Sequence, residues 1–234
     1  MKISVREQLS HPGNYGGSRK AEEIRYLVIH YTANDGDRAA NNAAYFQNNV
    51  VKASAHYFVD DDGVYRSVPD LRVAWSVGGK RYSNADRTGG GRLYGVVTNR
   101  NSLSVELCDT VKDGVYQASE TTLRHAAELC RELMERYHIP VERVCRHFDV
   151  TGKHCPSYLV GEKAWDKFKE RLVEPPSVPA QDNVPGKAHR EGVAWAVEQG
   201  ILRGTAAGDL MLSRPVTREQ MATMLYRFSK WNET

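Results

Sequence analysis

A single segment of the chain concentrates side chains that could bind a metal ion, together with a lysine. Within "CRHFDVTGKHCPSYLVG" (145–161) these are Cys145, His147, Lys153, His154 and Cys155. Zinc prefers imidazole nitrogen and thiolate sulfur, and a catalytic zinc site has three protein ligands and one open position. His147 and Cys155 are separated by seven residues that include Gly152, so both side chains can converge on one ion. The apolar content of the segment is too low to predict a buried helix or strand.

A third ligand has to come from elsewhere, and His30 is the best candidate. It follows the apolar run "LVI" in a predicted strand, and sites in open α/β sheets collect at the ends of strands. Taken singly, a histidine at a strand end is more often structural, and the spacing of His147 and Cys155 fits no zinc-finger pattern. Spacing alone therefore leaves a metal site and a structural role both open.

Hydrolysis at a metal also needs a group that moves a proton and a cation where negative charge develops. Glu106 is the candidate for the first role, although a carboxylate inside a strand more often marks a sheet edge or a salt bridge. Lys153, judged alone, is a solvated loop lysine. A thiol hydrolase with Cys155 as nucleophile and His147 as base is a second chemical possibility.

The elements that must position these residues are predicted from hydrophobic periodicity. Strands are expected at 24–33, 101–108 and 141–147, and two strands joined by an Asp-Asp-Gly turn at 54–69. Helices are expected at 37–49, 119–140 and 162–172. In the helix at 119–140, Ser119 is the predicted N-cap, and the predicted buried stripe is Leu123, Ala127, Cys130, Met134 and Tyr137. This pattern predicts an α/β fold with a central mixed β-sheet flanked by helices.

The pattern changes after residue 172. Residues 173–186 contain four prolines and few apolar residues, which is typical of a semi-rigid linker. Helical periodicity resumes at 188–202 and 217–231. We therefore predict a catalytic domain at 1–172, a Pro-rich linker at 173–186, and a small all-α module at 187–234.

Four motifs carry a resemblance to a known family. They are "VIHYTA", "SAHYFVDDDG", "SLSVELC" and "RHFDVTGKHCP", and they span residues 24–156. The domain resembles the type-2, zinc-dependent N-acetylmuramoyl-L-alanine amidases, which include phage endolysins and bacterial autolysins. The resemblance implies hydrolysis of the amide between N-acetylmuramic acid and L-alanine in peptidoglycan. A peptidoglycan-binding relative without catalysis is the alternative, and the presence of Cys155 argues against it.

The resemblance also implies roles for individual residues. It places Zn²⁺ on His30, His147 and Cys155. Glu106 falls at the acidic position that helps to deprotonate the metal-bound water in the endolysin branch. Lys153 falls at the position of the cation near the substrate carbonyl oxygen.

One motif departs from the family. Several relatives have a catalytic tyrosine immediately before the position of His56, whereas this chain has Ala55. Because this chain lacks the tyrosine, Glu106 becomes the stronger candidate for proton transfer. His56 is a candidate substrate-binding residue, with a structural role as its alternative. The Gly-rich stretch 84–102 favours a flexible surface loop over a wall of the substrate groove.

The C-terminal residues resemble a single S-layer homology repeat, through "GVAWAVEQGILRG" and "VTREQ". This resemblance implies binding to a secondary cell-wall polymer, with Arg218 near the polymer. Gln220 stands where that family usually has glutamate. The alternative is a helical pair that packs on itself, and a lone repeat would also expose apolar faces through which the chain could form a homo-oligomer.

Charge and composition limit the partners. The net charge of +3 and the pI of about 8.6 suit an anionic polymer and fall short of the basic patch of a nucleic-acid binder. The start "MKISVREQLSHPG" has no apolar signal region, and no stretch has the length of a membrane span. We therefore expect synthesis in the cytoplasm without a signal peptide, and action at the bacterial cell wall. Cys108 and Cys130 are expected as small buried residues, without a disulfide framework.

Overall fold

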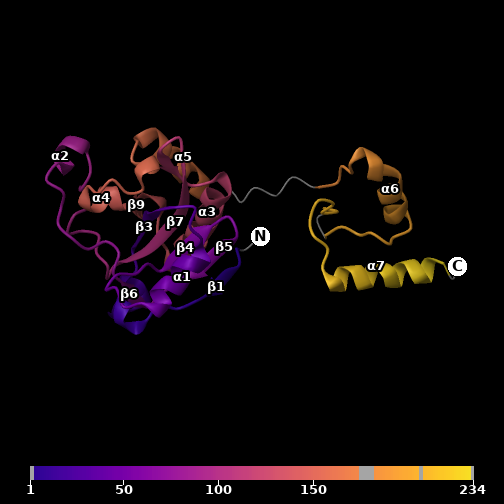
Figure 1. The fold of residues 1–234 in the computed structure, drawn as a ribbon, viewed down its shortest axis with the longest axis horizontal. Coiled ribbons are helices and arrows are strands. Elements are labelled where there is room, and N and C mark those ends of the chain that lie inside the picture. The colour runs from indigo at the N-terminus through magenta and orange to yellow at the C-terminus, as the bar shows by residue number, and fades with distance from the viewer. Residues whose placement is uncertain (1–2, 174–181, 206–207, 233–234) are drawn as a thin grey trace. The chain divides into compact units, whose positions relative to one another are not determined.

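The computed structural model describes residues 3–173, 182–205 and 208–232. The chain divides into two compact units, residues 1–174 and 175–234 (Figure 1). Residues 174–181 of the predicted linker at 173–186 lie outside the described residues.

Within residues 3–173, nine strands form the sheets of the first unit. They are β1 (Val5–Glu7), β2 (Tyr15–Ser18), β3 (Tyr26–Asp35), β4 (Tyr57–Asp60), β5 (Gly63–Arg66), β6 (Arg72–Ala74), β7 (Ser102–Lys112), β8 (Val115–Gln117) and β9 (Val144–Arg146). The main sheet has the order β1-β5-β4-β7-β3-β9, with β8 paired to β7, and β2 pairs with β6 separately. The central pairs β4–β7, β7–β3 and β3–β9 are parallel, while β4–β5 and β7–β8 are antiparallel. The predicted mixed sheet is therefore confirmed.

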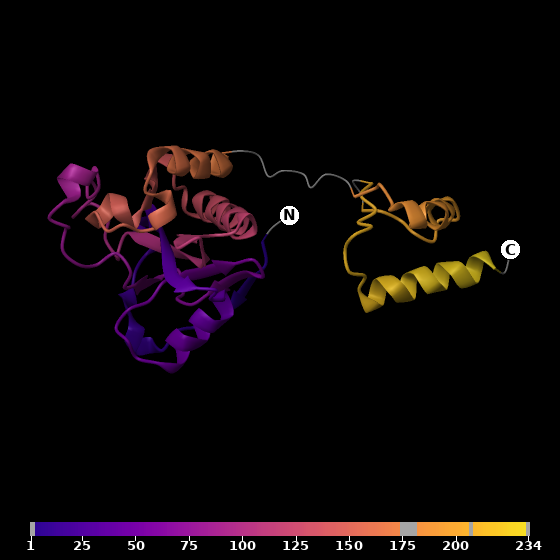
Figure 2. The same cartoon turned by 45° about the horizontal axis from the view of Figure 1, so that its top comes forward.

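Helices cover both faces of this sheet. Those of the first unit are α1 (Ala39–Asn48), α2 (Ala85–Thr88), α3 (Glu120–Tyr137), α4 (His147–Thr151) and α5 (Glu162–Val173). Figure 2 shows α3 and α5 on one side of the sheet and α1 on the other. Short 3₁₀ turns lie at Pro12–Asn14, Ala21–Glu23, Val141–Arg143, Ser157–Leu159 and Lys187–His189.

Successive side chains of the central strands point to opposite faces of the sheet, one apolar and one that carries polar residues. The residues facing α3 and α5 are apolar and fully buried, and they include Leu27, Ile29, Leu103, Val105 and Leu107. The residues that alternate with these along each strand point to the opposite face, and they include His30 and Glu106. Helix α5 adds Trp165, Phe168 and Leu172 to the core, as predicted. The large core thus lies behind the strands and holds their polar face rigid.

Two predictions need correction. In α3, Ser119 caps the first turn as expected, but three predicted stripe residues are only partly buried (Leu123, Met134 and Tyr137). Ala127 and Cys130 are buried as predicted, and the stripe is completed by Thr122, Ala126, Leu129 and Leu133. The strand expected at 141–147 is present as β9. The segment that follows was expected to lack a buried helix, yet α4 is almost entirely buried. Phe148 and Val150 supply the apolar contacts there, and an ion pair neutralises the buried Arg146.

The second unit contains α6 (Arg190–Glu198) and α7 (Arg218–Trp231). Thr217 caps α7 in a reciprocal hydrogen-bonded arrangement with Gln220. Neither helix contains a buried residue, and Ile201 is the buried apolar residue among those described in this unit. No described helix of the chain combines the length and apolarity that crossing a membrane requires.

Candidate metal centre

His30 and Glu106 lie side by side because β3 and β7 are parallel neighbours. His30 is the register partner of Glu106, so the two side chains leave the same face of the sheet. His30 Nδ1 lies 3.9 Å from Glu106 Oε1. The pairing explains why a carboxylate occurs inside this strand.

His147 reaches the same place from the next strand. β9 pairs with β3 in parallel, with Ile29 opposite Arg146, so the residue after Arg146 comes level with His30. The rings of His30 and His147 have centroids 4.7 Å apart. The carboxyl ends of two neighbouring parallel strands therefore deliver two imidazoles to one point.

Cys155 lies beside the two histidines because the loop that follows α4 turns back towards the start of that helix. The Phe148 backbone N–H donates to the Cys155 carbonyl at 2.9 Å, which ties the start of α4 to the end of the loop. Gly152 turns the chain with a φ of +84°, a conformation that favours glycine. As a result, Cys155 Sγ lies 3.9 Å from His30 Nδ1.

The donor set fits a zinc ion. One donor atom from each of His30, His147 and Cys155 lies within 4.8 Å of the other two, and all three residues are buried. His30 Nε2 and His147 Nδ1 are buried and have no hydrogen-bond partner among the described residues, and such unpaired atoms need an explanation. Two imidazoles and one thiol are ligands that zinc prefers, and three protein ligands leave a position open.

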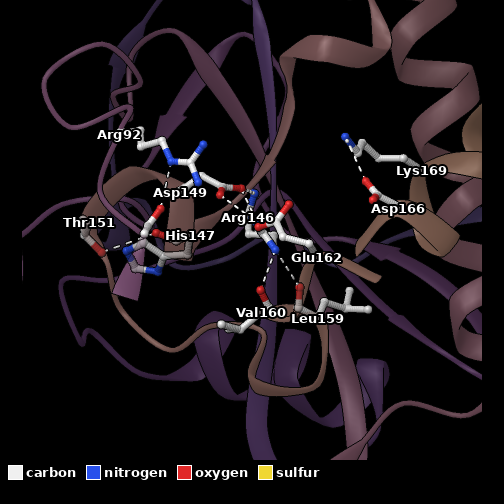
Figure 3. A network of polar contacts seen from close by, with 11 residues as sticks. Arg92, Arg146, His147, Asp149, Thr151, Leu159, Val160, Glu162, Asp166 and Lys169 are labelled. Atoms are coloured by element: carbon white, nitrogen blue, oxygen red, sulfur yellow. Dashed lines mark hydrogen bonds and ion pairs between the residues drawn. The ribbon is translucent and has the colours of Figure 1, made fainter. Parts of the chain in front are cut away.

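Arg146 fixes the segment that carries these ligands (Figure 3). It is 3% exposed, and its guanidinium donates to five acceptors at 2.7–3.0 Å: Asp149 Oδ1, Asp149 Oδ2, Glu162 Oε1, and the carbonyls of Leu159 and Val160. These acceptors lie in α4, in the turn after Cys155 and in α5. Arg146 thus joins the chain before His147 to the chain after Cys155. The sequence analysis did not identify it, although an arginine next to a candidate ligand was a usable signal.

The electrostatics of the pocket keep its groups neutral before any cation binds. Burial lowers the pKa of His30 far below its usual value, and burial and then Lys153 lower the pKa of His147 to about 4. Burial raises the pKa of Glu106 to about 8, and Lys153 acts against that rise. Burial raises the pKa of Cys155 to about 12, with Glu106 adding to the effect. A bound cation would reverse these preferences for Glu106 and Cys155, because it favours their anionic forms.

Lys153 lies at the rim of the centre, in an open groove of about 530 Å³. The groove is lined by Ser76, Gly78, Gly79, Lys80, Arg81, Tyr82, His147, Thr151 and Lys153. His147 and Lys153 connect it directly to the candidate metal centre. Sequence reasoning missed the wall formed by residues 76–82, where the run "GGKRY" was the available signal.

His56 does not line this groove. It is 1% exposed, and its Nδ1 accepts the Ser104 backbone N–H at 3.0 Å. Its Nε2 lies 2.8 Å from Arg19 Nη2 and 3.1 Å from the Arg72 carbonyl. Burial, with the Arg19 charge as the next cause, lowers the pKa of His56 to about 3. These surroundings favour the structural role. Ala55, at the position of the family's tyrosine, is also buried.

The Gly-rich stretch 84–102 packs against α4. Gly91 N–H donates to the Phe148 carbonyl at 2.9 Å, and Leu93 N–H donates to the Asp149 carbonyl at 2.8 Å. A Cβ at Gly90 would lie 2.8 Å from the Phe148 ring, so the close approach requires glycine. Many residues of this stretch are exposed, as expected for a surface loop. The contacts of residues 90–93 also hold it against the helix that starts at His147.

The remaining cysteines lie apart from the centre. Cys145 belongs to a small buried cluster with Val28 and Val150, and Cys108 and Cys130 are buried as expected. All four cysteines of the chain are free thiols.

Arg218 begins α7 in the second unit and is exposed. It does not line that unit's pocket of about 720 Å³. Three other arginines do (Arg203, Arg214 and Arg227), together with the single carboxylate of Glu219.

Comparison with known proteins shows the family of the chain. The family model described as N-acetylmuramoyl-L-alanine amidase (Amidase_2) matches residues 20–158. The chain is 34% identical over 177 residues to N-acetylmuramoyl-L-alanine amidase CwlA of Bacillus subtilis (strain 168), covering 74% of this chain and 58% of that protein. It is 33% identical over 174 residues to XlyB of the same organism, covering 74% and 50%. The chain thus spans about half the length of these curated relatives.

Solved structures show the same likeness. PlyL is 28% identical, with a TM-score of 0.59 over 75% of this chain and 100% of that chain. The catalytic domain of XlyA is 25% identical, with a TM-score of 0.56 over 73% of this chain and 99% of that chain. The family that the sequence motifs predicted is therefore confirmed, and the chain belongs to the N-acetylmuramoyl-L-alanine amidase family.

Proposed function

We propose that this protein hydrolyses the amide bond between N-acetylmuramic acid and L-alanine in peptidoglycan, with Zn²⁺ held by His30, His147 and Cys155. The observation that carries the proposal is the convergence of these three buried donors beside Glu106. Membership of the amidase family supports the reaction. Peptidoglycan is then the substrate, and the bacterial cell wall is the place of action.

Each polar group of the centre has a task in this reaction. Bound zinc would supply a water molecule of lowered pKa and a Lewis acid for the substrate carbonyl. Glu106 accepts a proton at its carboxylate and delivers it to the leaving amine of L-alanine. The Lys153 ammonium lies at the open rim, where it stabilises negative charge that develops on the carbonyl oxygen. Ala55 carries no polar group, so Glu106 is the proton carrier.

The thiol-hydrolase alternative fits this pocket less well. A nucleophilic cysteine needs a lowered pKa, whereas burial raises that of Cys155 to about 12 and burial lowers that of His147 to about 4. A thiolate–imidazolium pair is therefore disfavoured. A protein that only binds peptidoglycan would not need three converging metal donors and a buried carboxyl group.

Metal analysis and product analysis test the proposal together. Purified protein should contain about one zinc ion per chain, and chelation should abolish wall lysis until zinc is returned. Mass spectrometry of digested peptidoglycan should show new free L-alanine amines and no new reducing sugars. Full activity in metal-free protein, or new reducing sugars, would reject the assignment. Inactivation by a thiol reagent that leaves the zinc in place would favour the cysteine alternative.

For the second unit, we propose binding to a secondary cell-wall polymer, as the resemblance to an S-layer homology repeat suggests. The polymer is expected to be anionic, because the pocket of this unit has three arginines and one carboxylate. Arg218→Ala tests the residue named by the resemblance, and Arg203→Ala tests the pocket. Unchanged wall pull-down in both variants would reject this binding role.

A further inference from the structure

A second cavity of the first unit, of about 270 Å³, is rich in acidic side chains. It lies where the residues before α1, the turn between β4 and β5, the strand β7 and the first turn of α3 meet. Four aspartates line it: Asp37, Asp60, Asp61 and Asp109. Arg38 is the one basic side chain among the lining residues, and it forms an ion pair with Asp62, which lies outside the lining. The lining therefore carries more negative charge than the protein itself neutralises.

Asp109 is a buried carboxylate of this cavity with one oxygen unpaired. The residue is 3% exposed, and its Oδ1 accepts the Asn34 backbone N–H at 3.3 Å. Its Oδ2 is buried and has no hydrogen-bond partner among the described residues, and no basic side chain of theirs forms an ion pair with Asp109. Burial raises the pKa of Asp109 to about 6, and the charges of Asp37 and Asp35 add to the rise. The group is therefore mostly ionised at neutral pH, and a buried charge of this kind needs a cation beside it.

Hydrogen bonds hold the other carboxylates in place without cancelling their charge. Asp60 Oδ2 accepts the Ala39 backbone N–H at 2.8 Å, and Asp61 Oδ1 accepts the Thr122 hydroxyl at 2.8 Å. The groups that donate to the four aspartates are all neutral: backbone N–H, hydroxyl or side-chain amide. The negative charges thus have fixed positions around the cavity before any ligand arrives.

The spacing of these charges excludes a bare ion and suits a hydrated one. Among the described residues, only His30, His147 and Cys155 bring three donor atoms within 4.8 Å of one another, so the aspartates do not form a direct coordination shell. Mg²⁺ keeps several of its waters and is usually held by one or two carboxylates. Its full shell of six waters occupies about 180 Å³, at about 30 Å³ for each water. The cavity of about 270 Å³ has room for such an ion.

We infer that this cavity binds one hydrated divalent cation, with the carboxylate of Asp109 as its main anionic partner. The four carboxylates accept hydrogen bonds from the water shell of the ion, and the ion supplies the positive charge that the lining lacks. None of the lining residues is a donor of the metal centre, so the two sites are distinct and this one does not depend on the amidase reaction. The ion contacts the segments that precede α1 and α3 as well as β7, so its binding should stabilise the folded first unit.

Thermal unfolding of the zinc-loaded chain in rising MgCl₂, with NaCl of equal ionic strength as the reference, tests the site. The melting temperature should rise above the reference and saturate, by about 3–6 °C at ten times the dissociation constant. Equilibrium dialysis should give about one Mg²⁺ per chain. Cobalt(III) hexaammine has the shape of a hydrated ion and does not exchange its ammonia ligands, so it should compete with Mg²⁺ for this cavity without entering the metal centre.

Three variants locate the binding. Asp109→Asn keeps the shape and removes the buried charge, so it should lose the Mg²⁺ response and melt no lower than the wild type without Mg²⁺. Asp61→Asn changes an exposed carboxylate of the same cavity and should weaken Mg²⁺ binding severalfold. Asp166→Asn, at an exposed aspartate of α5 outside the cavity, should respond to Mg²⁺ as the wild type does.

Several results would contradict this site. A wild-type melting temperature that only follows the NaCl reference would overturn it, and so would a full Mg²⁺ response in both Asp109→Asn and Asp61→Asn. Mg²⁺ binding without competition from cobalt(III) hexaammine would overturn the hydrated form of the ion. Stabilisation by spermidine but not by Mg²⁺ would assign the cavity to an organic ammonium group and reject the metal ion.

Discussion

Glu106 is a carboxyl group placed in a pocket that favours its neutral form. Burial raises its pKa to about 8, and its Oε2 has no hydrogen-bond partner in the part of the chain that the structure describes. Burial favours the neutral form of Glu106 and a bound cation would favour the anionic form, and a carboxyl group under these opposing effects can take up a proton and give it away at neutral pH. Glu106→Gln keeps the shape and removes this capacity, so turnover should fall about 10²- to 10⁴-fold while zinc content and melting temperature stay near wild type.

The matched control for this substitution is Glu142→Gln, at an exposed position away from the centre. Its kcat on soluble muropeptides should equal that of the wild type. If Glu106→Gln also retained the wild-type kcat, the carboxyl would have only a structural role beside His30.

His56 links pH to stability. Its folded-state pKa of about 3 lies below the usual 6.5, so below pH 6.5 the unfolded chain binds a proton that the folded chain does not. The stability associated with neutral His56 is therefore complete above pH 6.5 and is lost as the pH falls towards 3. The slope from this residue is about 1.4 kcal/mol per pH unit.

Urea unfolding at several pH values, with zinc in excess, measures this slope. His56→Gln removes the titrating group, so the free energy of unfolding of the variant should depend on pH less steeply than that of the wild type by about one proton. Equal slopes in the two proteins would mean that His56 titrates normally in the fold.

At the scale of elements, Arg146 holds together three segments that surround the centre. Arg146→Met leaves the Asp149 carboxylate, whose side chain is 17% exposed, without its partner. Breaking a buried ion pair in this way costs about 3 kcal/mol or more. Because Arg146 precedes His147, zinc affinity should also fall, by about 10- to 100-fold.

Thermal unfolding and a zinc competition assay report the two effects separately. Arg87→Met, an exposed arginine of α2, should change neither quantity. Arg146→Lys keeps the charge but not the planar fork, and it should recover part of the stability and less of the zinc affinity. Wild-type zinc affinity in Arg146→Met would limit this residue to a role in folding.

Much of this element framework could be predicted from the sequence. The strands that carry His30 and Glu106 have β-branched apolar runs, and α3 and α5 have apolar residues at helical spacing. The turn between β4 and β5 has its Asp-Asp-Gly signature. Such local patterns reflect which face of an element is buried, and they are visible without the tertiary structure.

The features that could not be predicted from the sequence depend on contacts between residues far apart in the chain. The burial of β9 and α4 comes from packing on β3 and from the ion pair of Arg146, neither of which changes local periodicity. The register that sets His30 beside Glu106 joins residues far apart in the sequence. The groove wall at 76–82 is a loop anchored by Asn99 and Thr151, so no helix or strand pattern marks it. For these parts the decisive interactions are long-range.

On the scale of the whole molecule, the first unit has its own large core and the second has almost none. A chain that ends at residue 174 should therefore stay folded and cleave soluble muropeptides at the wild-type rate. If the second unit binds the wall, this shortened protein should bind whole cell walls more weakly, since it loses the effective concentration that a second site provides. Sedimentation with purified walls compares the two proteins, and equal binding would contradict the wall-binding role.

The second unit should also drive self-association. Helix α7 exposes several large apolar side chains, including Leu225 and Tyr226, which are 59% and 64% exposed. A module this small needs an additional contact to be stable, and a second copy of the same helix face can provide it. Light scattering should show the full chain as a dimer or trimer and the shortened chain as a monomer. A monomeric full chain would remove this claim and leave the amidase proposal untouched.

The pairing of β9 with β3 and the loop to Cys155 also determine at which stage of folding the metal site is complete. Its donors are far apart along the chain, at residues 30, 147 and 155, so they meet only after β9 has paired with β3. Contacts of such long range require loop closure before they can form, so we expect the three donors to converge after the transition state of folding. Zinc should therefore leave the refolding rate nearly unchanged and slow unfolding, because it stabilises interactions that are absent from the transition state. The ion would lengthen the lifetime of the folded protein without speeding its folding.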